Sequence, residues 1–234
     1  MRTPLVLLPG LSSNKILWQH QSYHLSDIAL VQIISAVQDT PEKMVQVILD
    51  EAPPQFALAG HSMGGWLCLE LMRVAPSRVT QLCLINTTAR MDSKEKTIRR
   101  KEMIQKAKAG QFQEVVEAMT EHFVFNPLVK NDVKKMFLEV GMQAFINQQH
   151  AMIERKESQS ILSIIACPTL VIHAARDKNF SFEEHEELVN QIPNAELAIV
   201  ENSGHMSPME NPEAITVLLR NWLISHGTKR ENSF

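Results

Sequence analysis

Six short apolar runs, separated by stretches of helical character, constrain the fold of this chain more than any other feature of its sequence. Each run is nearly all-apolar, which is the pattern of strands that are buried on both faces. Strands of this kind that alternate with helices form parallel sheets flanked by helices. We therefore predict an α/β fold with strands over Pro4–Leu8, Ile28–Ser35, Phe56–Ala59, Val79–Asn86, Pro168–His173 and Leu197–Glu201.

Three helices between these runs carry clear start and stop signals. One begins at Pro41 and ends before Pro53, and a second follows the glycine pair at 64–65 and ends before Pro76. A third begins after Asn211 and ends at Gly227. Proline is tolerated in the first turn of a helix and interrupts it later, so these positions mark helix boundaries.

The strand–helix rhythm stops between Met91 and Ser160. This stretch contains charged and amphipathic helical sequence without a strand pattern, and it is interrupted at Gly110, Asn126–Pro127 and Gly141. It is predicted to form several short helices.

We interpret residues 91–160 as a helical lid inserted before the strand that leads to Asp177, and residues 1–90 and 161–234 as the α/β core. Six of the twelve methionines of the chain lie in the inserted segment. Their flexible thioethers either line an adaptable apolar pocket or fill the helix core, and the sequence leaves both interpretations open.

The composition argues against several classes of protein. A formal net charge of −3 gives no basic footprint for nucleic acid, and a hydrophobic content of 44% is ordinary for a globular protein. The apolar run that ends at Pro9 is too short for an export signal or a membrane span. Cys68, Cys83 and Cys167 lie in apolar runs, where reduced thiols are expected, and no His/Cys spacing resembles a zinc site. We expect a cytoplasmic protein without a metal.

The pentapeptide Gly60-His61-Ser62-Met63-Gly64 matches the pattern G-x-S-x-G, with a predicted strand before it and a predicted helix after it. In such a turn the serine hydroxyl is exposed and the glycines allow the strand and the helix to approach closely. The N–H of the residue after the serine points toward a developing oxyanion. We predict Ser62 as a nucleophile and the Met63 N–H as an oxyanion donor.

A nucleophilic serine needs a base, and the base needs an orienting acid. Asp177 follows the strand that ends near His173, and His205 follows the last strand. Functional groups in open α/β sheets gather at the carboxyl ends of the strands, so these residues are expected to meet Ser62 there. Two simpler interpretations stay open, in which Asp177 is a turn residue and His205 caps the following segment.

The chain resembles the α/β-hydrolase superfamily, in its small cap-bearing group of esterases, lactonases, C–C bond hydrolases and haloperoxidases. The resemblance covers nearly the whole chain and is carried by the motifs LLPGLSSNKILW, GHSMGG, AARD and SGHMSPMENP. It implies that Ser62 is the nucleophile, that His205 is the general base and then the acid, and that Asp177 orients the imidazole. The Leu11 N–H would be the second oxyanion donor, and no cofactor or metal is implied.

Three departures from the family pattern shape these expectations. Pro9 stands where many relatives have histidine, which leaves a backbone donor in place. The chain begins at the third strand of the usual sheet, so about six parallel strands without a leading antiparallel pair are expected. Asn86 occupies a position where some relatives carry the triad acid, and because an amide cannot serve as that acid, the assignment of Asp177 is strengthened.

The resemblance favours hydrolysis of a small carboxylic ester through an acyl-enzyme on Ser62. C–C bond hydrolysis, enol-lactone opening and thioester cleavage use nearly the same residues, and fold analogy does not separate them. A ligand receptor with little turnover is an alternative of another class. The oligomeric state is left open.

Seven basic residues stand at the start of the inserted segment. They either form a solvated helix face or receive an acidic substrate or carrier protein. The cluster consists of Lys94, Lys96, Arg99, Arg100, Lys101, Lys106 and Lys108.

Overall fold

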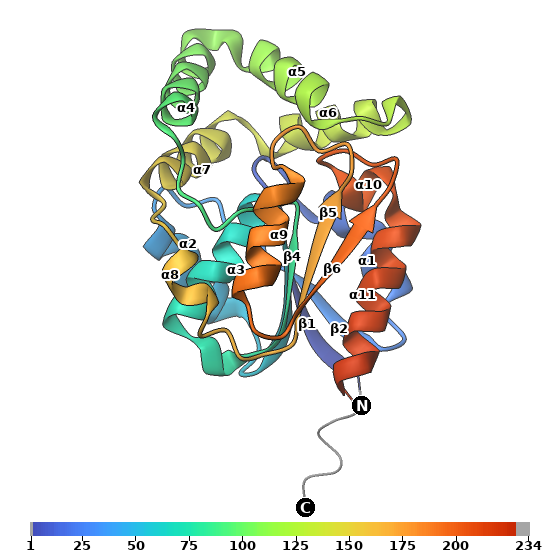
Figure 1. The fold of residues 1–234 in the computed structure, drawn as a ribbon. Coiled ribbons are helices and arrows are strands. Elements are labelled where there is room, and N and C mark those ends of the chain that lie inside the picture. Colours follow the sequence, from blue (N-terminus) through green and yellow to red (C-terminus); the bar gives the residue numbers. More distant parts are fainter. Residues whose placement is uncertain (1, 228–234) are drawn as a thin grey trace, which may run out of the picture.

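The computed structural model describes residues 2–227 and contains a single sheet of six parallel strands in the order β2-β1-β3-β4-β5-β6 (Figure 1). All six predicted strands are present, with their ends shifted by one or two residues, and the predicted α/β class is confirmed. The strands are β1 (Thr3–Leu8), β2 (Ala29–Ile33), β3 (Phe56–His61), β4 (Val79–Ile85), β5 (Thr169–Ala174) and β6 (Ala195–Val200).

The strand order places a switch point between β1 and β3. From β1 the chain crosses to β2 on one side and then returns to β3 on the other side of β1. The loops after β1 and β3 therefore leave the same sheet edge in different directions and open a crevice between them, which is where ligands bind in folds of this kind.

Helices cover both faces of the sheet. In Figure 1, α2, α3, α8 and α9 lie on one face, and α1 and α11 lie together on the other. The bounds of these helices are α1 (Gln19–His24), α2 (Pro41–Glu51), α3 (Met63–Val74), α8 (Gln159–Leu162), α9 (Phe182–Gln191) and α11 (Pro212–Gly227). Short turns of helix complete these connections: η1 (Lys15–Trp18), η2 (Pro76–Arg78) and α10 (Ser207–Glu210). No helix within residues 2–227 is long and apolar enough to cross a membrane.

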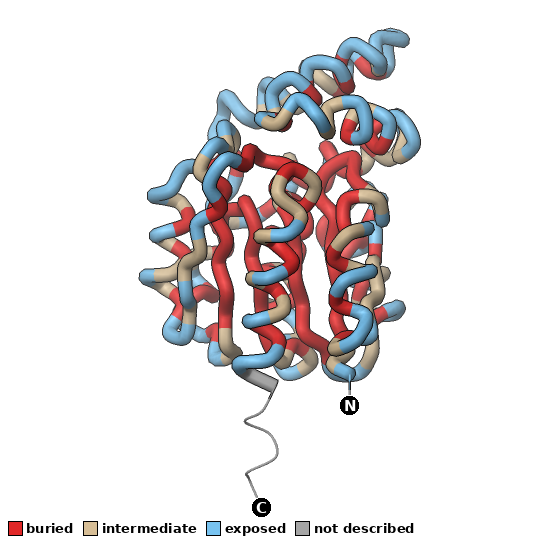
Figure 2. The backbone as a smooth tube through the Cα atoms, turned by 90° about the vertical axis from the view of Figure 1, so that its right-hand side faces the viewer, coloured by how far each residue is buried: buried red, intermediate tan, exposed pale blue. Residues whose placement is uncertain are grey.

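Burial separates the central strands from the edges of the sheet, as Figure 2 shows. β3 and β5 are buried along their whole length, and most of β1 and β4 is buried as well. β2 and β6 are only partly buried, because each has a neighbouring strand on one side alone. The expectation of two buried faces thus holds for the interior of the sheet and not for its edges.

A run of helices lies between β4 and β5, and in Figure 1 α4, α5 and α6 stand beyond the carboxyl ends of the strands. The breaks expected in this segment occur: Gly110 and Gly141 have φ of 88° and 86°, and the Asn126 side chain caps the turn that begins at Pro127. Positive φ is adopted without steric cost only by glycine. The elements are α4 (Lys94–Lys106), the π-helical turn η3 (Ala107–Gln111), α5 (Phe112–Phe123), η4 (Pro127–Val129), α6 (Lys130–Val140) and α7 (Met142–Glu154).

We predict that Leu84→Ala, in the buried centre of β4, lowers the free energy of unfolding by about 2–5 kcal/mol, because it removes packed methyl groups and leaves a cavity. Leu30→Ala, on the edge strand β2, is the matched control and should cost less than about 1 kcal/mol, because Leu30 is 49% exposed. Urea denaturation of both variants measures the difference. Equal losses of unfolding free energy in the two variants would contradict the burial described for the two strands.

Candidate functional site

Ser62 lies in a strained turn between β3 and α3. Its φ of 56° is in the left-handed region, which a residue with a Cβ rarely adopts. Three hydrogen bonds hold this conformation: the Ser62 N–H donates to Ile85 O at 2.9 Å, and Ser62 O accepts from Trp66 N at 3.1 Å and from Thr87 Oγ1 at 2.8 Å. The backbone of Ser62 is therefore tied to β4 and to α3, which fixes the direction of its side chain.

The glycines on either side of Ser62 are required by close packing, as the sequence predicts. A Cβ at Gly60 would lie 2.2 Å from Gly64 O, and a Cβ at Gly64 would lie 2.2 Å from Leu8 O. Any side chain at these positions would push β3, α3 and β1 apart.

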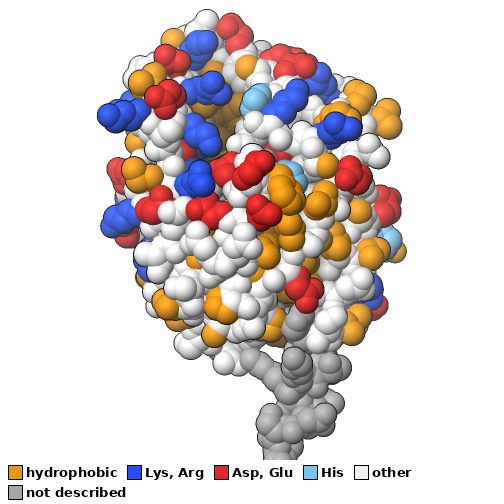
Figure 3. Space-filling view, viewed as in Figure 1, with side chains coloured by type: hydrophobic (Ala, Val, Ile, Leu, Met, Phe, Trp, Pro, Cys, Tyr) orange, Lys and Arg blue, Asp and Glu red, His pale blue; other side chains and the backbone are white. Residues whose placement is uncertain are grey.

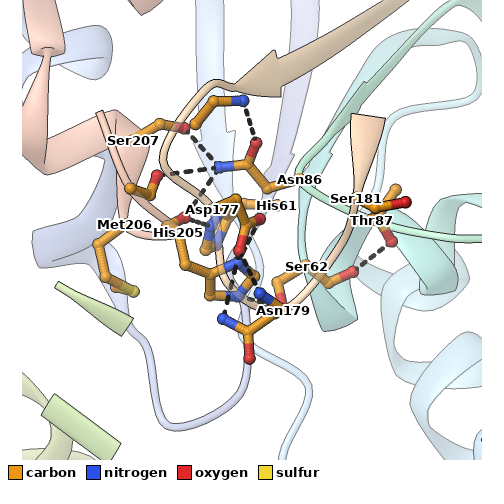
Figure 4. Close-up of polar contacts among 12 residues, drawn as sticks. His61, Ser62, Asn86, Thr87, Asp177, Asn179, Ser181, His205, Met206 and Ser207 are labelled. Atoms are coloured by element: carbon orange, nitrogen blue, oxygen red, sulfur yellow. Dashed lines mark hydrogen bonds and ion pairs between the residues drawn. The ribbon is translucent and has the colours of Figure 1, made fainter. Parts of the chain in front are cut away.

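The structure brings Ser62, His205 and Asp177 into one hydrogen-bonded chain (Figure 4). The Ser62 Oγ lies 2.9 Å from His205 Nε2, and His205 Nδ1 lies 2.9 Å from Asp177 Oδ2. Because a carboxylate only accepts hydrogen bonds, Nδ1 carries a proton and Nε2 is free to accept the serine proton. This is the geometry of a nucleophile, a base and an orienting acid.

Asp177 is held in its ionised form. Burial by itself would raise the pKa of this carboxyl, but His205 and the N–H of Asn179, which donates to Oδ1 at 2.7 Å, outweigh burial and lower the pKa below its usual value. A buried carboxylate that stays ionised stabilises positive charge on the imidazole beside it.

The loops that carry Asp177 and His205 leave neighbouring strands, β5 and β6, and are joined to each other. Ala175 N donates to Val200 O at 3.0 Å and Arg176 N donates to Ser203 O at 2.9 Å. These bonds continue the pairing of β5 and β6 past the ends of the strands, which explains why residues separated by 28 positions in sequence meet.

The carbonyl group of His205 is held by two buried side chains. Asn86 Nδ2 donates to His205 O at 2.9 Å and to Ser207 Oγ at 2.9 Å, while Asn86 Oδ1 accepts from Ala174 N at 2.9 Å. His61 Nε2 donates to the same carbonyl at 2.6 Å. Burial is the main reason that the pKa of His61 falls to about 3, so His61 is neutral and acts as a fixed donor.

Sequence reasoning excluded Asn86 as the acid and did not identify it as the residue that holds the His205 loop. The available signal was a polar residue at the end of a buried strand, which must find hydrogen-bond partners.

Glu210 connects the His205 loop to the helical segment above the sheet. Its carboxylate accepts from Gly204 N at 3.1 Å and Met206 N at 3.0 Å, and from Phe125 N at 3.0 Å and Asn126 N at 2.8 Å. Burial raises the pKa of Glu210, and these four N–H groups oppose that rise. The motif that pointed to His205 thus also contains its link to residues 125–126, which the sequence did not show.

The sequence predicts the N–H groups of Leu11 and Met63 as oxyanion donors, and the structure shows the surroundings of these two residues. Both residues line the same pocket as Ser62. Met63 is the first residue of α3, so its N–H has no carbonyl one turn earlier in the helix. Within residues 2–227 the Leu11 N–H donates no hydrogen bond, whereas the next N–H, that of Ser12, donates to Gln148 Oε1 on α7 at 2.9 Å. Gln148 therefore fixes the loop that carries Leu11, through a contact that could not be predicted from the sequence.

The pocket above Ser62 has a volume of about 390 Å³ and is formed by the sheet edge together with the helical segment. Figure 3 shows the hollow between α4 and α5, with hydrophobic side chains inside it and basic side chains around it. Its apolar lining includes Leu11, Met63, Met103, Val115, Ala118, Met119, Phe123, Met152 and Phe180, and its charged lining includes Asp92, Lys96, Arg99, Arg100, Glu102, Lys106, Glu114 and Arg155.

Both interpretations of the methionines hold in part. Met103, Met119 and Met152 line the pocket, Met136 is fully buried, and Met91 and Met142 are exposed.

The basic cluster also divides. Lys96, Arg99, Arg100 and Lys106 line the pocket, whereas Lys94, Lys101 and Lys108 are exposed and line no part of it. Of the four that line the pocket, only Arg100 is partly buried, so a solvated helix face describes the other six residues of the cluster, three of which also border the pocket.

Within residues 2–227 no group of three His, Cys, Asp or Glu side chains is arranged to hold a metal ion. The three cysteines are free thiols, and burial raises the pKa of each of them.

Comparisons with known proteins show what the whole chain is similar to. A family model described as alpha/beta hydrolase family matches residues 5–216. The chain is 24% identical to pimeloyl-[acyl-carrier protein] methyl ester esterase of Nitrosospira multiformis, with 89% of this chain and 90% of that protein covered.

Among solved structures, an esterase from Thermogutta terrifontis superposes with a TM-score of 0.88 at 26% identity, covering 97% of this chain and 91% of that one. The enol-lactonase of Burkholderia xenovorans, at 20% identity and a TM-score of 0.85, covers 96% of this chain and 92% of its own, and shares the fold.

We predict that Glu210→Gln destabilises the protein by about 1–3 kcal/mol, because an amide nitrogen cannot accept the N–H groups that face it. Amide hydrogen exchange at Phe125 and Asn126 should become faster. Glu213→Gln is the matched control, since the side chain of Glu213 is 78% exposed, and it should change neither quantity. Unchanged exchange in Glu210→Gln would show that the carboxylate does not hold this segment.

Asp177→Asn should lose a stabilisation that depends on pH. The pKa of Asp177 is lower in the folded protein than in the unfolded chain, so the unfolded chain takes up the proton first when acid is added. The stability that ionised Asp177 provides is therefore present above about pH 4 and is lost as the pH falls further. Denaturation of both proteins near pH 5 and near pH 3 should show a difference that narrows in acid. A difference in unfolding free energy that is the same at both pH values would contradict the predicted direction of the pH dependence.

Proposed function

Because the chain belongs to the alpha/beta hydrolase family and is a hydrolase, we propose that it cleaves carboxylic esters through an acyl-enzyme formed on Ser62. The observation that carries this proposal is the hydrogen-bonded chain from Ser62 Oγ through His205 to Asp177 at the floor of the pocket. Esters suit this arrangement because the attack needs only a proton acceptor, an orienting acid and donors for an oxyanion.

In the first step Ser62 Oγ attacks the ester carbonyl carbon while His205 Nε2 removes the serine proton. The oxygen of the carbonyl becomes negatively charged and is held by the N–H groups of Leu11 and Met63. Asp177 stabilises the imidazolium that forms, and the donors on the His205 carbonyl keep the ring in position.

The first half of the reaction is completed when the same groups act in reverse. His205 gives its proton to the leaving alcohol, whose departure leaves the acyl group on Ser62. Water then replaces the alcohol, and His205 removes a proton from it as it attacks the acyl carbon. The tetrahedral intermediate collapses as His205 gives this proton to Ser62 Oγ, which releases the acid and restores the Ser62 hydroxyl.

We assign residues 91–160 the role of a cap over the core formed by 1–90 and 161–234. Two sets of contacts support this assignment, because they connect the segment to the loop that carries Leu11 and to the loop that carries His205. Gln148 on α7 accepts from the Ser12 N–H beside Leu11 and donates to Ala36 O at 2.9 Å, and Glu210 joins residues 125–126 to the His205 loop. The cap would thus set the pocket and the geometry of the site together.

An acyl group attached to a carrier protein is a second candidate substrate. It is favoured by the name of the relative, an esterase of a methyl ester on an acyl-carrier protein, and by the basic side chains of α4 at the pocket.

The proposal also includes a cytoplasmic location, since the three cysteines are free thiols of the kind that persist in reducing compartments.

The test is stopped-flow release of p-nitrophenol from short p-nitrophenyl esters by the protein and by Ser62→Ala and His205→Ala. We expect a burst and sustained turnover in the unchanged protein and a fall of at least about 10³-fold in both variants. Intact-mass spectrometry during turnover should find the acyl group on the unchanged protein and not on Ser62→Ala.

Turnover that survives Ser62→Ala would refute the acyl-enzyme. Background rates in all three proteins, together with a melting temperature that rises with the same esters, would indicate a receptor.

A further inference from the structure

A buried cluster of polar side chains in the pocket has more positive than negative charge. Asp92, in the loop after β4, is the one carboxylate in the cluster, and two guanidinium groups contact it. Arg155, which follows α7, donates from a terminal nitrogen to Asp92 Oδ1 at 2.8 Å, and Arg100 on α4 donates to the other oxygen. The side chains of Asp92 and Arg155 are each 2% exposed, so water compensates little of this imbalance.

Nearby side chains do not restore the balance. Arg100 also donates to Gln149 Oε1 at 2.7 Å, which is a neutral acceptor. Glu184 and Glu157 lie close enough to favour the charged form of Arg155. The Glu184 carboxylate accepts from the Ser181 N–H, and the Glu157 carboxylate accepts from the N–H groups of Met91, Ser158 and Gln159. Burial lowers the pKa of Arg155 to about 10, against the opposite influence of Asp92, and at neutral pH the guanidinium remains charged.

Two buried donors in this cluster have no hydrogen-bond partner among residues 2–227. They are Arg155 Nε and Gln149 Nε2. An unpaired buried donor costs free energy, and an unbalanced buried charge costs more, so such groups are retained where a ligand completes them. Arg155 lines the pocket that contains Ser62, so a ligand in this pocket can contact its guanidinium group.

The rest of the pocket indicates which ligand would complete the cluster. The pocket that contains Ser62 and Arg155 has a largely apolar lining, and Met63, Met119 and Met152 belong to it. One surplus guanidinium charge matches one monoanion, and a carboxylate accepts hydrogen bonds from a guanidinium in a planar arrangement.

We propose that Arg155 is a specificity residue that binds a carboxylate at the far end of the acyl chain, so that the preferred substrates are monoesters of dicarboxylic acids. This inference rests on the proposed ester hydrolysis and names the substrate class for the same site. The ester carbonyl lies at Ser62, the methylene chain lies along the apolar wall, and the free carboxylate pairs with Arg155 beside Arg100 and Asp92.

The first measurement compares kcat/KM for monomethyl esters of succinic, glutaric, adipic and suberic acids with kcat/KM for methyl alkanoates of matching chain length. We expect at least one dicarboxylate monoester to be preferred by about tenfold or more, the factor that one charge-assisted hydrogen bond supplies. Arg155→Met should remove the preference, mainly through a higher KM for the acidic ester, and should change the neutral ester by less than about threefold. Arg155→Lys should retain part of the preference, because the charge remains.

Arg90→Met is the matched control. Arg90 is half exposed, pairs with Glu187 and does not line the pocket, so its loss should leave the preference unchanged. A preference that persists in Arg155→Met, or that Arg90→Met abolishes equally, would overturn the assignment.

A second measurement does not depend on the folding of Arg155 variants or on turnover. Glutarate and adipate should raise the melting temperature of Ser62→Ala and should compete with p-nitrophenyl acetate in the unchanged protein, whereas the corresponding diamides should do neither. Ester hydrolysis without any response to these dicarboxylates would refute the carboxylate site and leave the proposed function standing. Binding of dicarboxylates to Ser62→Ala without hydrolysis of any ester by the unchanged protein would support the site and refute the proposed function.

Discussion

The turn at Ser62 holds a residue with a side chain at φ 56°, a conformation that isolated chains avoid, and the neighbouring elements are arranged to keep it there. Its N–H is fixed by β4, its carbonyl by α3 and Thr87, and its flanking glycines by the lack of space next to β1. Strain of this kind costs of order 1–3 kcal/mol and persists only where the surrounding structure over-determines it. The buried sheet and the helices packed on it provide that surrounding structure.

A second set of interactions positions His205, and it consists of buried polar groups. Asn86 and His61 donate to its carbonyl, and Glu210 accepts the N–H groups on both sides of it. Buried polar groups contribute modestly to the stability of the folded protein when they are paired, and they cost folding free energy when they are left unpaired. Each of them therefore strongly constrains the conformation of the loop. Since Glu210 also holds residues 125–126, the loop that carries the base and the helical segment above it form one hydrogen-bonded unit.

The pocket combines two environments that make different demands on a ligand. The wall of methionine, valine and phenylalanine side chains excludes water and adapts in shape, since thioethers are flexible. The cluster of Asp92, Arg100 and Arg155 is rigid, because both guanidinium groups are fixed on one buried carboxylate. A ligand with an apolar middle and an anionic end satisfies both environments, whereas a purely apolar ligand leaves two guanidinium groups with one carboxylate.

The strands, helices and nucleophile turn of this fold could be predicted from the sequence because the forces that define them act locally. Continuous apolar runs marked the strands, prolines and glycines marked the helix ends, and the glycine spacing around Ser62 marked the turn. The meeting of Asp177 and His205 could be anticipated as well, since parallel strands all end at the same edge of the sheet.

The contacts of Asn86, Gln148, Arg155 and Glu210 were decided by the tertiary structure alone. Each has a partner that lies 63 to 136 positions away, and the sequence does not indicate which distant backbone group or carboxylate a polar side chain will contact. Hydrophobic periodicity in the sequence therefore determined which segments become strands and helices. The tertiary structure decided how the site residues are held and which polar groups remain for a ligand, because the pairing of buried polar groups depends on how the segments pack.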